Sequence, residues 1–193
     1  MNIKPIIEHF SNYRPLSESE ILELESKLKE KRVKRRQFIL QEGDVCKHFT
    51  FVVNGCFKMY KVDVNGLEHN LQFSIENGWI ADVGSFYSNK SSELYIEALE
   101  QSTILQIAKT DLLHLYSNYP KFDRIFRVLI ENAFVNLQKR VLQNISSTAE
   151  ERYLDFLKSY PNLFNRISNV QIASFIGVTP EFLSKIRKNI ATK

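Results

Sequence analysis

The sequence predicts an α+β protein with a β-rich N-terminal region, one long helix and a small C-terminal helical unit. Short β-branched and aromatic runs with Gly turns fill the chain between Phe38 and Ile107, which is typical of strands. An apolar stripe at helical spacing runs from Phe122 to Ile145, and two short capped helices follow Ser168. We divide the chain accordingly into residues 1–120, 121–146 and 147–193.

Composition is that of an ordinary globular protein. Of its 193 residues, 44% are hydrophobic and 25% are charged. No apolar run approaches the roughly 20 residues of a membrane-spanning helix. The segment Met1–Phe10 lacks the basic-then-apolar order of a secretory signal. We therefore expect a cytoplasmic protein without a membrane partner.

The two cysteines, Cys46 and Cys56, form no CxxC pair, and the four histidines are scattered. His48 lies two residues from Cys46, so these two side chains could form part of a metal site. A closed zinc or iron–sulfur site, however, needs four ligands. We expect reduced thiols packed in strands and no metal. No Ser/His/Asp order, Gly-rich phosphate loop or paired-carboxylate motif points to an enzyme.

The first segment is expected to be helical. Ser17 and Glu20 have the spacing of a capping box, and Ile21, Leu24 and Leu28 follow at helical spacing. The cationic run 27–36 then raises the question of nucleic-acid binding. We interpret it instead as the solvated end of this helix, where cations meet the negative helix pole.

The middle of the chain is expected to form strands. Phe49–Val53 is aromatic and β-branched, and Asn54-Gly55 and Asn65-Gly66 each carry the strongest short-range hairpin signal. Further turns are expected at Gly43-Asp44 and Asn77-Gly78. Strands at this spacing with Gly-led turns predict a sandwich or a barrel-like roll.

The long helix carries more apolar surface than one core needs. Its apolar positions are Phe122, Phe126, Leu129, Ile130, Ala133, Phe134, Leu137, Val141 and Ile145. A seam continued this far can face the roll and also a partner helix. We predict a homodimer formed through residues 121–146, with a domain boundary near Ser146.

Charge is unevenly distributed along the chain. Residues 1–138 carry 17 Lys/Arg and 18 Asp/Glu, a net charge of −1, whereas residues 139–193 carry 9 and 4, a net charge of +5. A basic C-terminal part indicates a polyanionic partner, although a merely solvated basic face gives the same signal.

The C-terminal pair of helices has helix-turn-helix spacing. Ser168 with Gln171 predicts a capped first helix, Ala173 allows close helix approach, and Gly177 is suited to a left-handed turn. Thr179 followed by a proline opens the second helix. Its inner face is formed by Leu183, Ile186 and Ile190. A plain helical hairpin is the alternative to a DNA-binding unit.

The outer edge of this second helix carries the groups that would meet double-stranded DNA. The expected contacts are Thr179, Pro180, Glu181, Ser184, Lys185 and Lys188. Lys185 can donate to guanine O6 and N7, and Glu181 can accept from cytosine N4. Thr179 and Lys188 are better placed for phosphates.

The whole chain, essentially residues 20–190, resembles the Crp/Fnr family of bacterial transcription regulators, especially its short members in Bacteroidetes-type bacteria. The resemblance is carried by Phe38–Asp44, Phe51–Gly55, Asn65-Gly66 and Ile167–Lys188. It implies a cyclic-nucleotide-binding-like β-roll of the jelly-roll (double-stranded β-helix) kind as sensor domain, a long dimerisation helix and a winged helix-turn-helix. It also makes RNA polymerase a candidate partner.

The ligand site departs from the family pattern. Cyclic-nucleotide binders carry a Gly-Glu pair for the ribose and an Arg-Ser or Arg-Thr pair for the cyclic phosphate. Here Ala81-Asp82-Val83-Gly84 and Ser92-Glu93 stand in those places, and the adenine-reading hydroxyl pair aligns with Leu137-Gln138. The resemblance therefore places the effector pocket at Asp82, Val83, Gly84, Ser92, Glu93, Leu137 and Gln138.

Serine cannot replace a guanidinium as a phosphate partner. Losing such a partner costs about 2–5 kcal/mol, or roughly 30-fold to several-thousand-fold in affinity. We therefore expect no cofactor and no cyclic AMP. Either the roll binds a different small effector, or it is an empty structural unit. A ligand-binding module with a vestigial helix-turn-helix is the alternative function.

Overall fold

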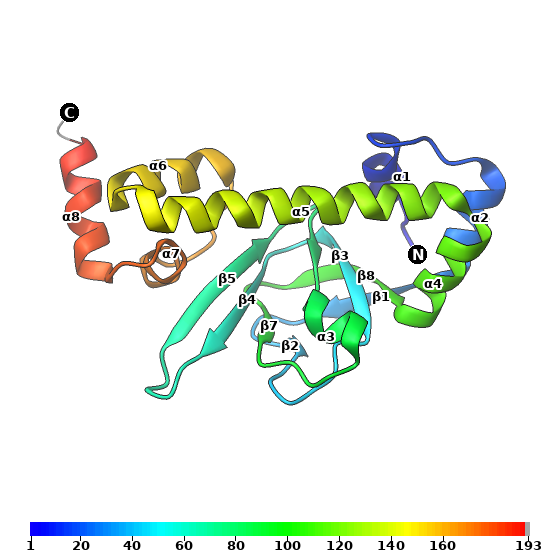
Figure 1. The fold of residues 1–193 in the computed structure, drawn as a ribbon, viewed down its shortest axis with the longest axis horizontal. Helices are drawn as coiled ribbons and strands as arrows, with labels where there is room; N and C mark the ends of the chain where they lie inside the picture. The colour runs from blue at the N-terminus through cyan, green and yellow to red at the C-terminus, as the bar shows by residue number, and fades with distance from the viewer. Residues whose placement is uncertain (192–193) are drawn as a thin grey trace.

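The computed structural model describes residues 1–191, so Thr192 and Lys193, the end of the unit predicted at 147–193, lie outside the described residues. One helix, α5 (Pro120–Ser146), spans the length of the molecule (Figure 1). The β-roll lies along it. The C-terminal helices gather at one end of α5, and the N-terminal helices with α4 (Lys109–Asn118) gather at the other.

The N-terminal helices are α1 (Lys4–Ser11) and α2 (Glu18–Lys27). The predicted capping box of Ser17 and Glu20 is confirmed. The predicted basic helix end is wrong, because Leu28–Val33 forms strand β1 and pairs antiparallel with β8. Leu28 and Val33 are buried while the four residues between them are exposed. Backbone pairing outweighs helix propensity here, and the cationic side chains suit a sheet edge that must not aggregate.

Two four-stranded antiparallel sheets form the roll and confirm the predicted jelly-roll architecture. Their strand orders are β1-β8-β3-β6 and β2-β7-β4-β5. A short helix, α3 (Val83–Ser88), lies between β6 and β7. The remaining strands are β2 (Phe38–Leu40), β3 (His48–Asn54), β4 (Phe57–Val62), β5 (Glu68–Ser74), β6 (Trp79–Ile80), β7 (Tyr95–Ala98) and β8 (Ser102–Ala108).

The two Asn-Gly signals have different outcomes. Asn65-Gly66 lies in the loop that joins β4 to β5, so that hairpin is confirmed. Asn54-Gly55 is not a hairpin, since β3 and β4 belong to different sheets and the chain crosses between them there. Gly55 has φ 115°, and a Cβ at this position would lie 2.0 Å from the Ser102 hydroxyl oxygen. Close packing of two strands, rather than a tight turn, requires this glycine.

An aromatic cluster joins the roll to the helices. Trp79 stacks on Phe10 of α1 and contacts Phe49, Phe51 and Phe126 at ring-centroid distances of 5.1 to 6.0 Å. These side chains fill the face of the first sheet that α1 and α5 cover. The N-terminal half of α5 is thereby fixed on the roll.

Both cysteines are buried free thiols, and each lies just outside a strand rather than within one. No three His, Cys, Asp or Glu side chains among residues 1–191 gather as a metal site requires. Within the same range, no helix has the length and apolar character needed to cross a lipid bilayer.

The C-terminal unit contains α6 (Ala149–Ser159), α7 (Asn169–Ile176) and α8 (Pro180–Ala191). Ser168 with Gln171 forms a complete capping box, as the sequence predicts, and Thr148 with Glu151 forms another at the start of α6. Residues 161–167 form turns and a bend, and the described part of this unit contains no strand. The wing implied by the resemblance is therefore absent from residues 147–191.

Candidate nucleic-acid interface

The turn between α7 and α8 has the geometry that its sequence predicts. Gly177 ends α7 in the left-handed region, with φ 74°. The Val178 N–H then donates to the Ala173 carbonyl at 3.0 Å, so the chain reverses without leaving α7. Ala173 and Leu183 are fully buried where the two helices meet. This packing holds α8 rigidly against α7.

The start of α8 is capped by a side chain. The Phe182 N–H donates to the Thr179 hydroxyl at 3.2 Å, and Pro180 takes the first helical position. Hydrogen bonds from its own backbone N–H and from Thr179 hold the pKa of Glu181 below its ordinary value. Glu181 is therefore a fixed anion at the exposed start of α8.

The residues predicted to contact DNA share one outer edge of α8. Thr179, Glu181, Ser184, Lys185 and Lys188 are exposed, and Pro180 is half-buried beside them. The Ser184 hydroxyl donates to the Pro180 carbonyl at 2.9 Å. Two exposed lysines thus stand on the face opposite the buried stripe.

Phe182 belongs to this edge although the sequence analysis did not select it. Its side chain is 49% exposed between Glu181 and the buried Leu183. An aromatic ring in this place can contact a thymine methyl group. The spacing gave no such signal, since residue 182 lies four residues before Ile186 and thus beside the inner stripe. Only the folded chain shows that its ring is exposed.

Arg187 is held in place on the side of α8. Its guanidinium donates to the Asn169 side chain at 2.6 Å and lies 4.8 Å from the Phe164 ring centroid. It buttresses α8 against the start of α7.

The helix-turn-helix is docked on the roll by an ion-pair cluster. Arg166 reaches Glu76 at 2.8 and 2.9 Å and Glu100 at 2.5 Å. Burial alone would raise the pKa of Glu76, but hydrogen bonds from Arg166 and from the Gly55 N–H hold it below its ordinary value. Nearby, the Ser174 hydroxyl donates to the Glu68 carbonyl at 2.6 Å.

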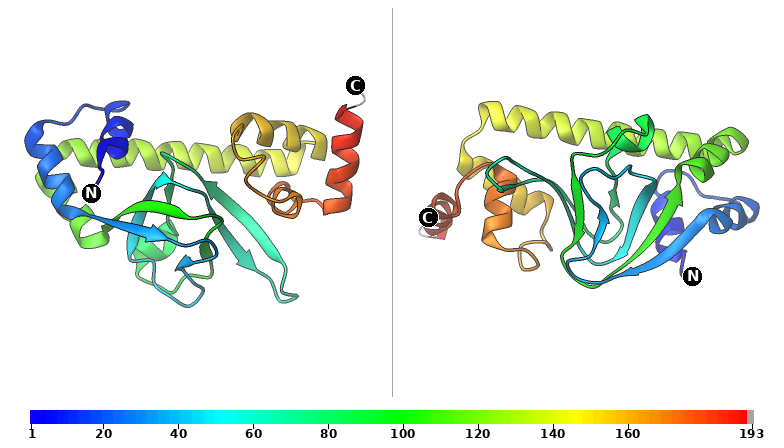
Figure 2. Two further views of the ribbon diagram at one scale, coloured as in Figure 1. Left: turned by 180° about the vertical axis from the view of Figure 1, so that it is seen from behind. Right: turned by 90° about the horizontal axis from the view of Figure 1, so that it is seen from below.

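A second arginine joins α5, β5 and α7. The Arg140 guanidinium donates to the backbone carbonyls of Asn70, Leu71 and Phe175, and it lies 4.0 Å from the Phe175 ring centroid. Figure 2 shows that β5 and α7, far apart in sequence, lie side by side. No sequence pattern indicated Arg140 or Arg166, because their partners are distant carbonyls and carboxylates.

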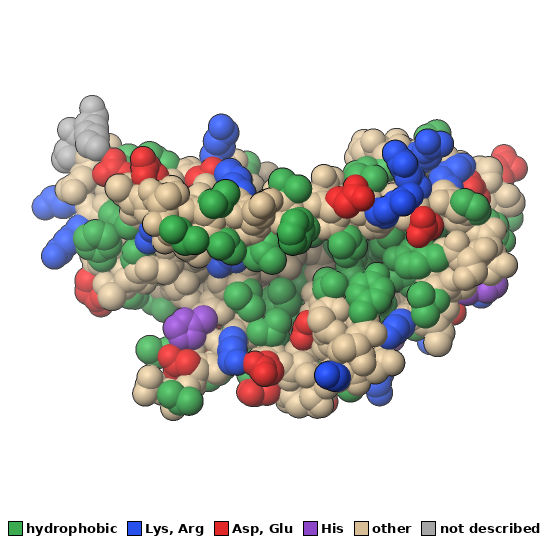
Figure 3. Space-filling view, viewed as in Figure 1, with side chains coloured by type: hydrophobic (Ala, Val, Ile, Leu, Met, Phe, Trp, Pro, Cys, Tyr) green, Lys and Arg blue, Asp and Glu red, His purple; other side chains and the backbone are tan. Residues whose placement is uncertain are grey.

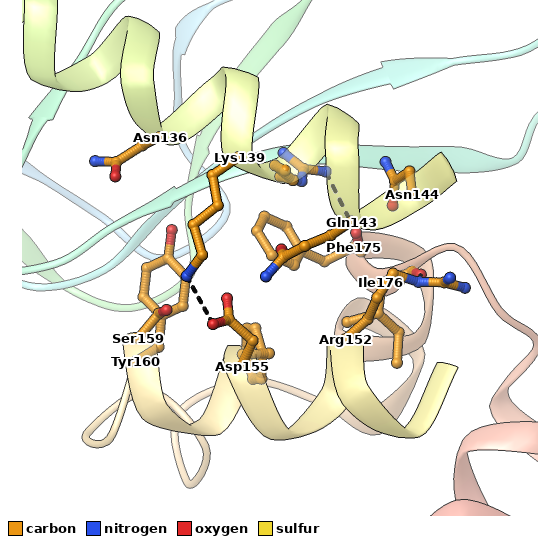
Figure 4. Close-up of a pocket in the computed structure, with 12 residues that line it drawn as sticks. Asn136, Lys139, Gln143, Asn144, Arg152, Asp155, Ser159, Tyr160, Phe175 and Ile176 are labelled. Carbon is orange, nitrogen blue, oxygen red and sulfur yellow. Dashed lines mark hydrogen bonds and ion pairs between the residues drawn. The ribbon is translucent and has the colours of Figure 1, made fainter. Parts of the chain in front are cut away.

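A groove of about 460 Å³ lies between α5, α6 and α7 (Figure 4). Its cations are already engaged within the chain. Lys139 on α5 pairs with Asp155 on α6 at 2.7 Å. Arg152 donates to the carbonyls of Ile176 and Ser147 at 2.9 and 2.7 Å. The groove is a joint between the long helix and the helix-turn-helix.

Comparison with known proteins agrees with this arrangement. Residues 30–119 match the model of the cyclic nucleotide-binding domain. Electron transport regulator A of Shewanella oneidensis is 24% identical over 183 residues, which cover 89% of this chain and 72% of that protein. The structure of a Crp/Fnr-family transcriptional regulator from Eubacterium rectale has a TM-score of 0.73 at 15% identity, covering 96% of this chain and 88% of that one.

Over most of its length the chain therefore has the fold of a solved Crp/Fnr-family regulator. The structure of FixK2 from Bradyrhizobium japonicum has the same fold, with a TM-score of 0.75 at 18% identity over 86% of this chain and 85% of that one. Both solved structures thus share the fold of this chain over most of its length.

The positions aligned with the Crp/Fnr effector site are only partly brought together. Asp82 caps α3 by accepting from the Ser85 N–H at 3.1 Å, and its other oxygen accepts from the Ser92 hydroxyl at 2.7 Å. Glu93 is exposed and paired with Lys61. Val83 and Gly84 are exposed at the start of α3.

Leu137 and Gln138 lie elsewhere, on an exposed stretch of α5. Leu137 is 57% exposed. The two helix positions and the cassette of Asp82 and Ser92 line neither the groove between α5, α6 and α7 nor a second cavity inside the roll.

Proposed function

We propose that this chain is a homodimeric, sequence-specific DNA-binding transcription regulator that acts in the bacterial cytoplasm by binding rather than by catalysis. One observation carries the proposal: α8 presents an exposed edge with Glu181, Ser184 and Lys185 while its opposite face is buried. A helix mounted this way can enter a major groove N-terminal end first. The net charge of +5 in residues 139–193 supports a polyanionic partner.

The dimer is supported by an apolar band along α5. In Figure 3 hydrophobic side chains line this helix on the face toward the viewer. Exposed band members are Phe134, Val135, Leu137, Val141, Leu142 and Ile145, each at least 50% exposed. A bare apolar stripe of this length on a helix is typical of a seam between two copies. Pairing along α5 would set two α8 helices against two half-sites.

A cyclic phosphate does not fit the cassette. Both oxygens of Asp82 already accept hydrogen bonds within the chain, and the Ser92 hydroxyl donates to one of them. Glu93 adds a second carboxylate, and its cation partner Lys61 is already paired. We propose that the regulator works without cyclic AMP.

Selection of duplex sequences by the full chain tests the proposal. We expect an enriched operator whose affinity falls steeply with salt. Lys185→Ala should lose about 1–3 kcal/mol at one base position and relax preference there. Lys188→Ala should weaken all sequences alike and lower the salt slope by about one.

The matched control is Lys90→Ala, which removes an exposed lysine from a roll loop and should change neither property. If no duplex is enriched and none is bound at low salt, the DNA-binding proposal fails. The helix-turn-helix would then be vestigial and the chain a ligand-binding module.

A further inference from the structure

The roll contains a cavity of about 290 Å³ that shares no residue with the cassette. It lies where β1, β3 and β8 face β2 and β7 across the roll. Its polar and charged lining residues are Lys31, Asp44, Lys47, His48, Thr50 and Gln106. Apolar side chains of the surrounding strands complete the wall. The volume corresponds to about ten water molecules, which suits a metabolite of about ten non-hydrogen atoms.

Gln106 is buried at this cavity with an unused acceptor. Its side-chain N–H donates to the Thr50 hydroxyl at 3.1 Å, whereas its carbonyl oxygen has no partner among residues 1–191. Gln106 is 3% exposed, and Thr50 is 2% exposed. Buried acceptors in folded proteins are nearly always satisfied, so this oxygen calls for a donor from outside the chain.

The rim of the cavity is cationic. Lys31 comes from β1, His48 is the first residue of β3, and Lys47 directly precedes it. In the described chain neither lysine forms an ion pair, and Asp44 is the one carboxylate in the lining.

The pKa of His48 is affected by the same positive charges. Burial lowers the pKa of His48, and the charges of Lys31, Lys29 and Lys47 lower it further. Lys29 faces the same side of the sheet, since it pairs with Gln106 in the β1–β8 register. Like charges that converge without forming an ion pair are stabilised by a bound anion.

We propose that this cavity binds a small organic anion that also carries a hydroxyl group. The carboxylate of the ligand lies against Lys31 and Lys47, and its hydroxyl donates to the orphan oxygen of Gln106. As an effector site it rests on the proposed function, but ligand binding itself does not depend on DNA binding. The site is separate from the cassette of Asp82 and Ser92, which it leaves untouched.

The test uses the full chain in a phosphate-free buffer with defined probes. L-malate and D-glycerate carry both a carboxylate and a hydroxyl, succinate lacks the hydroxyl, and glycerol lacks the charge. We expect the two hydroxy acids at about 10 mM to raise the thermal midpoint and to give calorimetric binding. Succinate should bind about tenfold more weakly, since it cannot satisfy the buried acceptor. Glycerol should give no shift.

Three variants locate the site. Gln106→Leu removes the orphan acceptor and also the donor to the buried Thr50 hydroxyl, so the chain should fold with somewhat lower stability while the preference for malate over succinate disappears. The double variant Lys31→Gln/Lys47→Gln should bind every anionic probe at least about tenfold more weakly. Lys90→Gln, a matched exposed lysine outside the cavity, should bind as the natural chain does.

The proposal is overturned if neither hydroxy acid binds, or if binding survives unchanged in Lys31→Gln/Lys47→Gln. It is also overturned if Gln106→Leu keeps the full preference for malate. A preparation that binds malate but no duplex would sink the DNA-binding function and leave this site standing. The reverse result would sink the site alone.

Discussion

The two halves of α5 have the same apolar periodicity and opposite surroundings. Phe122, Ile125 and Phe126 are buried beneath the roll and α1. Phe134 and Ile145, further along, are 64% and 78% exposed. The comparison shows that an apolar stripe predicts a buried helix face but does not indicate whether the same chain or a second chain covers that face. One half finds its cover within the chain, and the other half lacks it.

The largest expected effect is a loss of stability from a substitution in the buried half of α5. Phe126→Ala leaves a cavity beside Trp79 and should cost about 3–5 kcal/mol in the free energy of unfolding. Phe134→Ala removes an exposed ring and should leave the stability of the dilute chain nearly unchanged. Urea unfolding at low protein concentration measures both. Equal losses there would mean that Phe134 is covered within its own chain.

The next effect concerns the exposed half. Leu137→Glu puts a charge into the proposed seam and should weaken self-association by about 30- to 1,000-fold, or about 2–4 kcal/mol. Analytical ultracentrifugation measures it. Asn132→Glu is the matched control, because helical geometry turns residue 132 away from the band. Unchanged association in Leu137→Glu would show that the band is not the seam.

A smaller effect is expected where the C-terminal unit docks on the roll. Arg166→Gln removes the charged partner of Glu76 and Glu100, groups that are about one-third exposed. We expect a loss of about 1 kcal/mol, discounted for solvent screening. Hydrogen exchange in β5 and α7 should accelerate while exchange in the aromatic core near Phe126 stays slow. Acceleration in both places would mean that the chain unfolds as one unit and that the docking is not separable.

The smallest expected effect is a pH dependence of the free energy of unfolding, caused by His9 of α1, which packs near the buried half of α5. Burial lowers the pKa of His9 below 6.5, and its ring accepts from the Trp79 indole N–H at 3.3 Å. Because the folded state favours the neutral ring, this contribution is fully present above about pH 6.5 and is lost as pH falls through the folded value.

Unfolding measured between pH 7.5 and 5.5, about the range in which histidine titrates, should show this loss. His9→Gln keeps an acceptor without titrating, so its stability should fall less. A slope as steep in His9→Gln as in the natural chain would assign the dependence to other groups. His48, whose pKa is lowered in the same direction, is the first of these.

Local signals in the sequence were sufficient for much of the candidate site. The caps at Thr148, Ser168 and Thr179, the left-handed Gly177 and the buried stripe of α8 all follow from contacts within a few residues. The exposed edge of α8 could therefore be predicted before the fold was known.

Signals that depend on distant partners failed or were absent. The residues of β1 have a helical pattern in the sequence, but they form a strand because β8 pairs with them. Asn54-Gly55 has the pattern of a hairpin, but the chain crosses between the two sheets there and Gly55 packs against Ser102. The charged clusters of Arg140 and Arg166 have partners roughly 35 to 90 residues away in sequence.

The sequence by itself determined the order of the parts, the capped helix-turn-helix and the excess of apolar surface on α5, because each depends on spacing along one element. The tertiary structure alone decided which half of α5 is covered, how the C-terminal unit sits on the roll, and that Gln106 faces a cationic cavity with an empty acceptor. These depend on groups brought together from separate strands and helices, and no local pattern encodes such a meeting.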